Sequence, residues 1–444
     1  MKFKSIFIAN LAEIAKPLAE LMGKARQEEE IFEDHALCDR FLFSDTDKRI
    51  LITPFLLDQN FVKDVCQTLN YHTFLNLAPQ EVGDSLCEAI IRDKKLLTQI
   101  SQVIKSNPGI NFVAYAATPE FLKLVDKLRQ EGLTFRTPEI PQPEAQWTSA
   151  FFDSKSGFRQ SVPYLGPEFA AMPEGFICHN FSEIFGWTSY FLEKSDGCVL
   201  KTNRGLAGAG VKIIRKKDLS KINLSNYLRE IIESELYWQR EPVVVEQLVE
   251  IEPSIAGGNP SVEFQVTDQK VIPLYVCGMR VTAEGVFRGV EIGKGAVPQK
   301  LVQLLFAQGK LWARFLQKIG YRGFFDIDYV YDKKGKIYPI ESNIRRTGGT
   351  HVYEMTKRLL GKGYLDKYYV VANNIISAPR FAQKDYLSVK KALAHLFYPL
   401  KGQKEGVILT DITLLAKGSL GYVIIGKDKK RVAKIEEDFL KLLA

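Results

Sequence analysis

Short apolar runs alternate with amphipathic segments over the first 137 residues. The runs have the length of buried strands, whereas the segments between them repeat apolar residues at three- and four-residue intervals, as helices do. We expect strands at SIFIAN (5–10), RFLF (40–43), RILITP (49–54) and NFVAYAATP (111–119). We expect helices at 11–27, 58–69 and 120–132. Strand–helix alternation favours an open, mostly parallel α/β sheet. No glycine fingerprint follows the first strand, so we expect no dinucleotide there.

The pattern changes after residue 137, where TPEIPQPEAQ (137–146) holds three prolines and indicates an extended linker. Near the end of the chain a helical pattern at 385–397 precedes strand-like runs at 406–415 and 421–426 and a last charged helix. The predicted organisation is an N-terminal open α/β domain (1–137), a Pro-rich linker (138–147), a central domain (148–362) and a small α+β C-terminal domain (363–444).

Composition limits the classes of function. With 444 residues, 46% of them hydrophobic, the chain can form two or three domains with substantial cores. Its net charge of +8 is spread along the sequence without a dense basic block, so we expect no nucleic-acid partner. No apolar run reaches the roughly 18 residues of a membrane span. Asn10, Glu13 and Lys16 interrupt the apolar N-terminus, which argues against a signal peptide. The six cysteines form no C-x-x-C pair, and we expect a cytoplasmic protein.

Polar residues gather in GFFDIDYVYDKKGKIYPIESN (323–343), which has the pattern of a β-hairpin with its turn at 332–335. Opposed across such a hairpin, Asp328 and Glu341 can converge on one face, and Asn343 shares that face because the strand period is two. Three oxygen ligands of this kind suit Mg²⁺ and are poor for zinc. Asp326, also on alternation, is an alternative ligand, and a polar face that looks at water is the other interpretation.

A glycine-rich stretch, CVLKTNRGLAGAGVKII (198–214), lies between two apolar runs. Backbone N–H groups around Gly205, Gly208 and Gly210 could approach phosphates closely, and Lys201 could add a positive charge. The stretch lacks the Gly-Lys-Ser/Thr of a P-loop, and a strand follows where a P-loop has a helix. The alternative interpretation is a flexible hairpin loop.

A third candidate is PVVVEQLVEIEPS (242–254), an apolar strand that ends on polar residues. Its backbone groups could pair with the edge of an adenine, and its acidic side chains could hold a ribose hydroxyl. The residues concerned are Glu246, Gln247, Leu248 and Val249. Taken alone, the segment is better explained as an ordinary strand end.

Taken in order, these motifs resemble those of the ATP-grasp superfamily. The superfamily has a D-K-x-x-x-R/K segment, a strand lysine before a Gly-rich loop, an acidic hinge and a D-x12-E-x-N metal hairpin. The first motif matches Ser154-Lys155 with Arg159, where Ser154 departs from the usual Asp. The remaining motifs match Lys201 with its glycines, the hinge at 246–249, and Asp328 with Glu341 and Asn343.

A narrower resemblance links Glu341, Asn343 and Arg345, followed by Gly348 to His351, with the pheganomycin-type peptide ligases. These ligases have a pre-ATP-grasp domain in front and a small C-terminal domain behind, as the domain pattern here suggests. The chain departs from them because an additional residue precedes the glycines and Val352 replaces a proline.

The resemblance implies an ATP-dependent carboxylate–amine (peptide) ligase that works through an acyl phosphate. Lys155 and Lys201 would hold ATP phosphates, and the Asp328, Glu341 and Asn343 trio would hold one or two Mg²⁺ ions, with Mn²⁺ as an alternative. Arg345 would hold the acyl phosphate, and Arg280 is a second phosphate candidate.

The implied substrates are a small-molecule carboxylate and an amine, either an amino acid or a peptide. Arg346 should point away from the site, and His351 is either a substrate contact or a structural residue. Whether the protein forms a homodimer is left open by the sequence. The alternatives are a small-molecule kinase and a nucleotide-binding regulatory protein without ligase activity.

Overall fold

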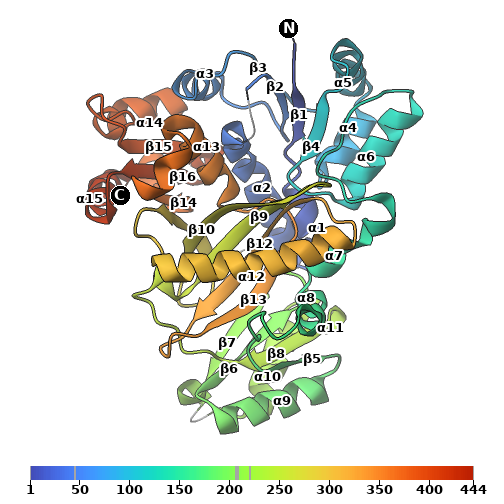
Figure 1. The fold of residues 1–444 in the computed structure, drawn as a ribbon, viewed down its shortest axis with the longest axis vertical. Helices are drawn as coiled ribbons and strands as arrows, with labels where there is room; N and C mark the ends of the chain where they lie inside the picture. Colours follow the sequence, from blue (N-terminus) through green and yellow to red (C-terminus); the bar gives the residue numbers. More distant parts are fainter. Residues whose placement is uncertain (1, 45–46, 206–209, 220–221, 444) are drawn as a thin grey trace.

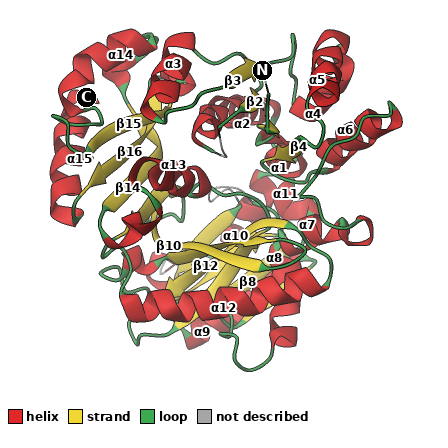
Figure 2. Ribbon diagram, turned by 45° about the horizontal axis from the view of Figure 1, so that its top comes forward, coloured by secondary structure: helices red, strands yellow, loops and turns green. Residues whose placement is uncertain are grey.

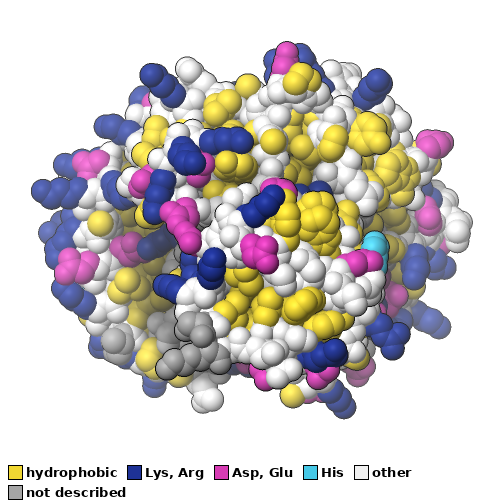
Figure 3. All heavy atoms as spheres, turned by 90° about the horizontal axis from the view of Figure 1, so that it is seen from below, with side chains coloured by type: hydrophobic (Ala, Val, Ile, Leu, Met, Phe, Trp, Pro, Cys, Tyr) yellow, Lys and Arg dark blue, Asp and Glu magenta, His cyan; other side chains and the backbone are white. Residues whose placement is uncertain are grey.

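A computed structural model describes residues 2–44, 47–205, 210–219 and 222–443. Three β-sheets organise these residues, one for the N-terminal part, one for a small lobe and one large sheet between them (Figure 1). Within the described ranges, none of the helices combines the length and the apolar character that a membrane crossing requires. The face in Figure 3 carries acidic and basic side chains interspersed with apolar ones.

The N-terminal sheet has four parallel strands in the order β3-β2-β1-β4. Parallel neighbours require crossover connections, which the helices between the strands supply. The predicted open parallel α/β sheet is therefore confirmed. Its strands are β1 (Ser5–Ile8), β2 (Arg49–Ile52), β3 (Phe74–Leu77) and β4 (Asn111–Ala114). Its helices are α1 (Ala12–Ala19), α2 (Lys24–Ala36), α3 (Gln59–Thr68), α4 (Leu86–Arg92), α5 (Lys94–Ser106) and α6 (Pro119–Gln130).

Two local predictions in this part are wrong. The run RFLF is the end of a 3₁₀ helix, η1 (Leu37–Phe43), in which every residue is buried. Burial on all sides gives an apolar run whose periodicity cannot distinguish a strand from a helix. The predicted helix at 11–27 is broken at Gly23, which precedes α2, and α2 then continues to Ala36.

The small lobe is an antiparallel sheet in the order β5-β8-β6-β7 with helices packed on it. Its own hydrophobic core includes Leu18 and Met22 from the N-terminal part, which joins the two regions. Its strands are β5 (Gly175–Cys178), β6 (Gly197–Thr202), β7 (Val211–Arg215) and β8 (Val243–Gln247). Its helices are α9 (Phe181–Lys194), α10 (Leu224–Ser234) and α11 (Tyr237–Arg240).

The large sheet is antiparallel, with the order β13-β12-β9-β10-β11-β14-β16-β15. The predicted domain boundary at 362/363 divides this sheet, because β14, β16 and β15 extend it from β11. Its central strands are β9 (Pro260–Val266), β10 (Val271–Val281), β11 (Phe287–Gly293), β12 (Gly323–Tyr331) and β13 (Ile337–Asn343). The C-terminal strands are β14 (Tyr369–Ser377), β15 (Gly406–Asp411) and β16 (Ser419–Gly426).

Helix α12 (Gln299–Lys318) lies across one face of this sheet (Figure 2). Its apolar residues recur at helical spacing, which places Leu301, Leu305 and Trp312 in the core. Gly309 allows close approach, since a Cβ there would lie 2.3 Å from the ring of Phe264 on β9. The other helices around the sheet are α7 (Trp147–Phe152), α8 (Lys155–Ser161), α13 (Thr350–Leu360), α14 (Tyr386–Leu393) and α15 (Lys429–Leu443).

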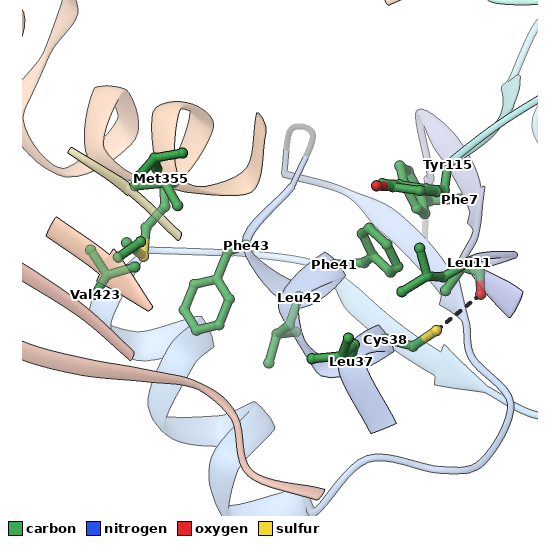
Figure 4. Packing of buried hydrophobic residues seen from close by; sticks show 14 of the residues in the cluster. Phe7, Leu11, Leu37, Cys38, Phe41, Leu42, Phe43, Tyr115, Met355 and Val423 are labelled. Atoms are coloured by element: carbon green, nitrogen blue, oxygen red, sulfur yellow. Dashed lines mark hydrogen bonds between the residues drawn. The ribbon is translucent and has the colours of Figure 1, made fainter. Parts of the chain in front are cut away.

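One hydrophobic core runs through the N-terminal sheet and the large sheet. The helix η1 lies inside this core, where Phe43 belongs to the same cluster as Met355 of α13 and Val423 of β16 (Figure 4). The Cys38 thiol donates a hydrogen bond to the carbonyl of Ala9 at 3.1 Å. The N-terminal part is thereby held against the rest of the chain, and its residues can reach a shared site.

Candidate functional site

A cavity of about 700 Å³ lies where the three sheets meet. Strands β6, β7 and β8 of the small lobe line one side of it, and β10, β12 and β13 of the large sheet line the other. Residues of α2 and the segment after β4 close it from the N-terminal part. The cavity therefore has walls from every region of the chain.

The predicted hairpin is confirmed and supplies the most polar wall of the cavity. Strands β12 and β13 are antiparallel, with Asp328 opposite Glu341 and Asp326 opposite Asn343. All four residues line the cavity. The Asn343 amide donates to Asp326 Oδ1 at 2.8 Å and to Asp328 Oδ2 at 3.3 Å. The Asn343 amide therefore lies at least as close to Asp326 as to the predicted ligand Asp328.

The two aspartates carry an electrostatic cost. Burial, followed by the charge of Glu341, raises the pKa of Asp328 to about 7. Burial and the charge of Asp328 raise the pKa of Asp326 well above its usual range. Burial would also raise the pKa of Glu341, but the positive charges of Lys155, Lys201 and Arg345 outweigh it and lower that pKa. A bound cation would relieve the repulsion between the aspartates.

The donor set fits a magnesium ion. Asp328 Oδ1 is buried without a hydrogen-bond partner, so it is an acceptor that lacks a donor or a cation. Carboxylate and amide oxygens are ligands that Mg²⁺ accepts. Over the described ranges, no three His, Cys, Asp or Glu side chains are grouped tightly enough to hold a metal by themselves. An ion here would complete its coordination with water or phosphate oxygens, as Mg²⁺ usually does.

Both predicted phosphate lysines lie in the cavity wall and both are paired with carboxylates. Lys155 Nζ lies 2.9 Å from Glu341 Oε1, and Lys201 forms an ion pair with Glu246. Glu246 also accepts a hydrogen bond from Arg159 at 2.5 Å. Phosphate oxygens would compete with these carboxylates for the two ammonium groups.

The glycine-rich stretch joins β6 and β7, as the sequence predicts. Gly205 lines the cavity. Gly208 lies outside the described residues. Gly210 has a φ of +78°, and a Cβ there would lie 2.0 Å from the Thr202 hydroxyl oxygen, so the turn requires glycine.

The hinge segment also reaches the cavity, where Glu246, Gln247, Leu248 and Val249 are all lining residues. The backbone N–H of Gln247 donates to the carbonyl of Glu174 at 2.8 Å, and the backbone N–H of Leu248 donates to the carbonyl of Gly197 at 3.2 Å. Sequence reasoning assigned an acidic side chain of this segment to a ribose hydroxyl. Glu246 instead directs its carboxylate to Lys201 and Arg159.

The arginines divide into two groups. Arg345 is buried in the cavity wall and forms an ion pair with Asp153, whose carboxylate also accepts from the N–H of Ile344 at 2.6 Å. Arg346 points away, as expected, and pairs with Glu139 of the predicted linker. His351 is fully buried and is absent from the described lining residues.

The structure does not bring Arg280 to this site, contrary to its choice as a phosphate candidate. Its neighbours Met279 and Val281 line the cavity, and strand alternation turns Arg280 to the opposite face of β10. There its guanidinium donates to Glu436 of α15 at 2.5 Å. Arg280 therefore joins the last helix to the sheet.

Sequence reasoning missed Glu263, a carboxylate inside the buried strand β9. It accepts hydrogen bonds from the hydroxyls of Tyr275, Thr347 and Thr350 at 2.5, 2.7 and 2.7 Å. Burial raises its pKa to about 7 in spite of these donors. Glu263 thus fixes the turn that presents Gly348 and Gly349 to the cavity. A lone acid within an apolar run was the available signal.

The chain is similar to known proteins in its structure. No family model and no curated protein matches the chain. Solved structures do match over nearly the whole chain. An N5-carboxyaminoimidazole synthase from Aspergillus clavatus, in complex with ADP and 5-aminoimidazole ribonucleotide, superimposes with a TM-score of 0.55 at 10% identity, covering 99% of both chains. The chain has the ATP-grasp fold.

Two further solved structures share the ATP-grasp fold with this chain. An ADP complex of N5-carboxyaminoimidazole ribonucleotide synthetase (PurK) has a TM-score of 0.53 at 14% identity and covers 99% of this chain and 96% of its own. A biotin carboxylase from Campylobacter jejuni has a TM-score of 0.54 at 15% identity, covering 98% and 90%. In this ATP-grasp fold the cavity lies between the small lobe and the large sheet.

Proposed function

We propose that the protein is an ATP-dependent carboxylate–amine ligase. The observation that carries the proposal is the facing of Asp328 and Glu341 across the hairpin, in one cavity with Lys155 and Lys201. Anionic and cationic groups buried together in this way suit a nucleotide with a divalent ion. Three of the solved structures with the same fold are complexes with ADP or ATP, which supports the same ligand here.

The proposed reaction needs positioning and charge neutralisation more than covalent help from the protein. A carboxylate oxygen of the acid attacks the γ-phosphorus and ADP leaves, which gives an acyl phosphate. The amine nitrogen then attacks the acyl carbon, phosphate leaves, and the amine loses a proton. Lys155 and Lys201 hold phosphates in this scheme, and Arg345 stabilises the anionic acyl phosphate through its planar fork.

The divalent ion belongs to Asp328, Glu341 and Asn343 in this proposal, with Asp326 as the fourth neighbouring oxygen ligand. Bound there, Mg²⁺ or Mn²⁺ supplies charge stabilisation to the phosphate oxygens. The chain's own contribution is to keep these oxygens fixed, through the hydrogen bonds from Asn343 to both aspartates.

The finer assignment to peptide ligation rests on sequence. The E-x-N-x-R motif and the glycines before His351 resemble those of the pheganomycin-type ligases. The Gly348–Gly349 turn lines the cavity, where its backbone could meet a substrate carboxylate. We propose an amino acid or a peptide as acid and amine.

Hydroxylamine trapping tests the proposal. Purified protein is screened for ADP release with Mg-ATP against pooled amino acids and peptides, and hydroxylamine is then added with the active acid. We expect a hydroxamate, because hydroxylamine captures an acyl phosphate. A stable phosphorylated alcohol would instead identify a kinase. Nucleotide binding with no turnover on any pool would favour a regulatory protein.

A further inference from the structure

Three carboxylates of the N-terminal part line the cavity. Glu30, Glu33 and Asp34 stand at positions i, i+3 and i+4 of α2 and line the cavity together. This spacing places them on one face of the helix. Like charges at such positions destabilise a helix by a few tenths of a kcal/mol per pair. The sequence therefore keeps an arrangement that local stability disfavours.

Two cations of the cavity wall, Arg40 and Arg345, form ion pairs with other acids. Among the described residues, none of the three carboxylates forms a salt bridge. Arg40 directs its Nε to Asp411 at 3.1 Å, and Arg345 pairs with Asp153. Arg26, which precedes these acids on α2, pairs with Glu235 at 2.6 Å. Arg40 and Arg288 lie near enough to Glu33 for their charges to lower its pKa, but among the described residues neither forms an ion pair with any of the three acids.

Two buried acceptors in the cavity wall lack a donor. Asp34 is 4% exposed and its Oδ2 has no hydrogen-bond partner. Asn374, on β14, is 7% exposed and its Oδ1 also has no partner. An unsatisfied buried polar group costs about 1–3 kcal/mol, so two of them in one cavity indicate a ligand that donates hydrogen bonds.

Burial and mutual repulsion reinforce this reading of the site. Burial, then the charges of Glu30 and Glu33, raise the pKa of Asp34 well above its usual range. Burial and the charge of Glu30 raise the pKa of Glu33. A cation among the three acids would offset both effects. Leu37, the first residue of η1, and Phe287 of β11 add apolar side chains to the wall of this cavity, which suits the aliphatic stem of such a ligand.

We propose that Glu30, Glu33 and Asp34 form a subsite for a positively charged nitrogen group, an ammonium or guanidinium, on a substrate of the ligation. The inference rests on the proposed function, since it names the substrate class of that same cavity. The cation can belong to the acid or to the amine. Arg40, whose Nη2 is also without a partner, adds one donor for an anionic group of the same molecule.

Matched pairs of probes separate the two sources. L-Arginine and its neutral isostere L-citrulline test a cation on the acid, and 1,4-diaminobutane and 1-aminobutane test a second cation on the amine. Calorimetry with the full chain, at millimolar ligand and both without nucleotide and with Mg-ADP, measures each probe. We expect the charged member of at least one pair to bind 10-fold or more tighter than its neutral partner.

Variants of α2 assign the binding to the three acids. Glu33→Gln and Asp34→Asn should each weaken binding of the charged probe by about 10-fold or more. Glu33→Gln removes a charge from the subsite, and Asp34→Asn replaces a carboxyl group that has an unpartnered acceptor oxygen. Glu29→Gln is the control, since Glu29 neighbours Glu30 on the same helix but is exposed and outside the cavity wall. If Asp34→Asn fails to fold, Glu33→Gln, at a half-buried position, still decides.

The inference is overturned if neither charged probe is preferred over its neutral partner, or if both variants bind it as the unmodified protein does. These results are independent of the nucleotide site. Absence of Mg-ADP binding contradicts the proposed function, whereas the titrations without nucleotide still support or overturn the cation subsite. A charged probe that binds with an unchanged Mg-ADP affinity supports both.

Discussion

Arg345 combines burial, charge and an incomplete set of partners. Its guanidinium pairs with Asp153, while its Nε is buried without a hydrogen bond. Burial alone would lower its pKa, but the charges of Asp153, Tyr115 and Asp326 raise it, so Arg345 stays positively charged. A fixed cation in the cavity wall is what a transferring phosphoryl group requires.

Replacement of Arg345 by lysine tests this role. The Arg345→Lys change keeps the charge and loses the planar two-point fork. We expect kcat to fall by ~10²-fold, as for loss of one transition-state donor, with little change in ATP affinity. Steady-state kinetics and calorimetry measure the two quantities. Arg280→Lys is the matched control and should leave kcat nearly unchanged, because Arg280 faces Glu436 outside the cavity.

Glu341 supports a second prediction at this scale. Glu341→Gln keeps the shape of the side chain but removes a carboxylate that faces Asp328 and pairs with Lys155. Turnover should be lost, and the Mg²⁺ concentration for half-maximal nucleotide binding should rise by about 10-fold or more. Magnesium titrations with circular dichroism as the folding check measure this. A Glu341→Gln enzyme with normal activity and metal dependence would place the metal elsewhere, with Asp326 as the first candidate.

At the scale of elements, local signals were sufficient for the hairpin and insufficient for its surroundings. Asp328 and Glu341 could be predicted to face each other because turn residues and alternation lie within one short stretch. The pairing of Asp153 with Arg345 and the place of Asp34 in the cavity wall could not, since both depend on how segments far apart in sequence pack together. The glycine-rich stretch was correctly predicted to lie between two strands. Arg280 was predicted to bind phosphate from its strand alone, and the packing of the sheet, which decides the face on which its side chain lies, could not be predicted.

The contact between α12 and β9 permits a prediction about stability. Alanine is favoured over glycine in a helix by about 1 kcal/mol, but at Gly309 a Cβ would collide with the buried ring of Phe264. Overpacking costs typically ~1–3 kcal/mol. The overpacking cost offsets the helix-propensity gain, so we expect Gly309→Ala to lower the free energy of unfolding by up to about 2 kcal/mol, measured by urea titration.

The exposed Gly186 in α9 is the control for this change. A Cβ at Gly186 meets no atom within 4 Å. Gly186→Ala should therefore raise the free energy of unfolding by about 0.5–1 kcal/mol. If Gly309→Ala is equally stabilising, the close packing of α12 on β9 is wrong.

At the scale of the whole molecule, η1 connects the first residues of the chain with the last strands. Asp39 accepts hydrogen bonds from the N–H of Ile412 at 2.8 Å and from the N–H and hydroxyl of Thr413 at 2.6 and 2.9 Å. Its neighbour Arg40 pairs with Asp411 at the end of β15. The N-terminal wall of the cavity therefore depends on residues some 370 positions away.

This connection predicts how stability depends on pH. Burial raises the pKa of Asp39 from 3.8 to about 7, so the folded protein holds this proton more tightly than the unfolded chain does. The resulting stability is fully present below about pH 4 and is lost as pH rises through about 7.

Asp39→Asn removes the titration and one acceptor, and should destabilise the protein by about 1–3 kcal/mol at pH 5. Between pH 5 and pH 8 the free energy of unfolding of the unmodified protein should fall by about 2–3 kcal/mol relative to that of the variant. Urea unfolding followed by tryptophan fluorescence measures the free energy of unfolding at both pH values.

Thr413→Val, which removes only the hydroxyl donor, should keep the original pH dependence. An Asp39→Asn protein whose stability falls with pH as steeply as that of the unmodified protein would show that Asp39 is already ionised in the folded state.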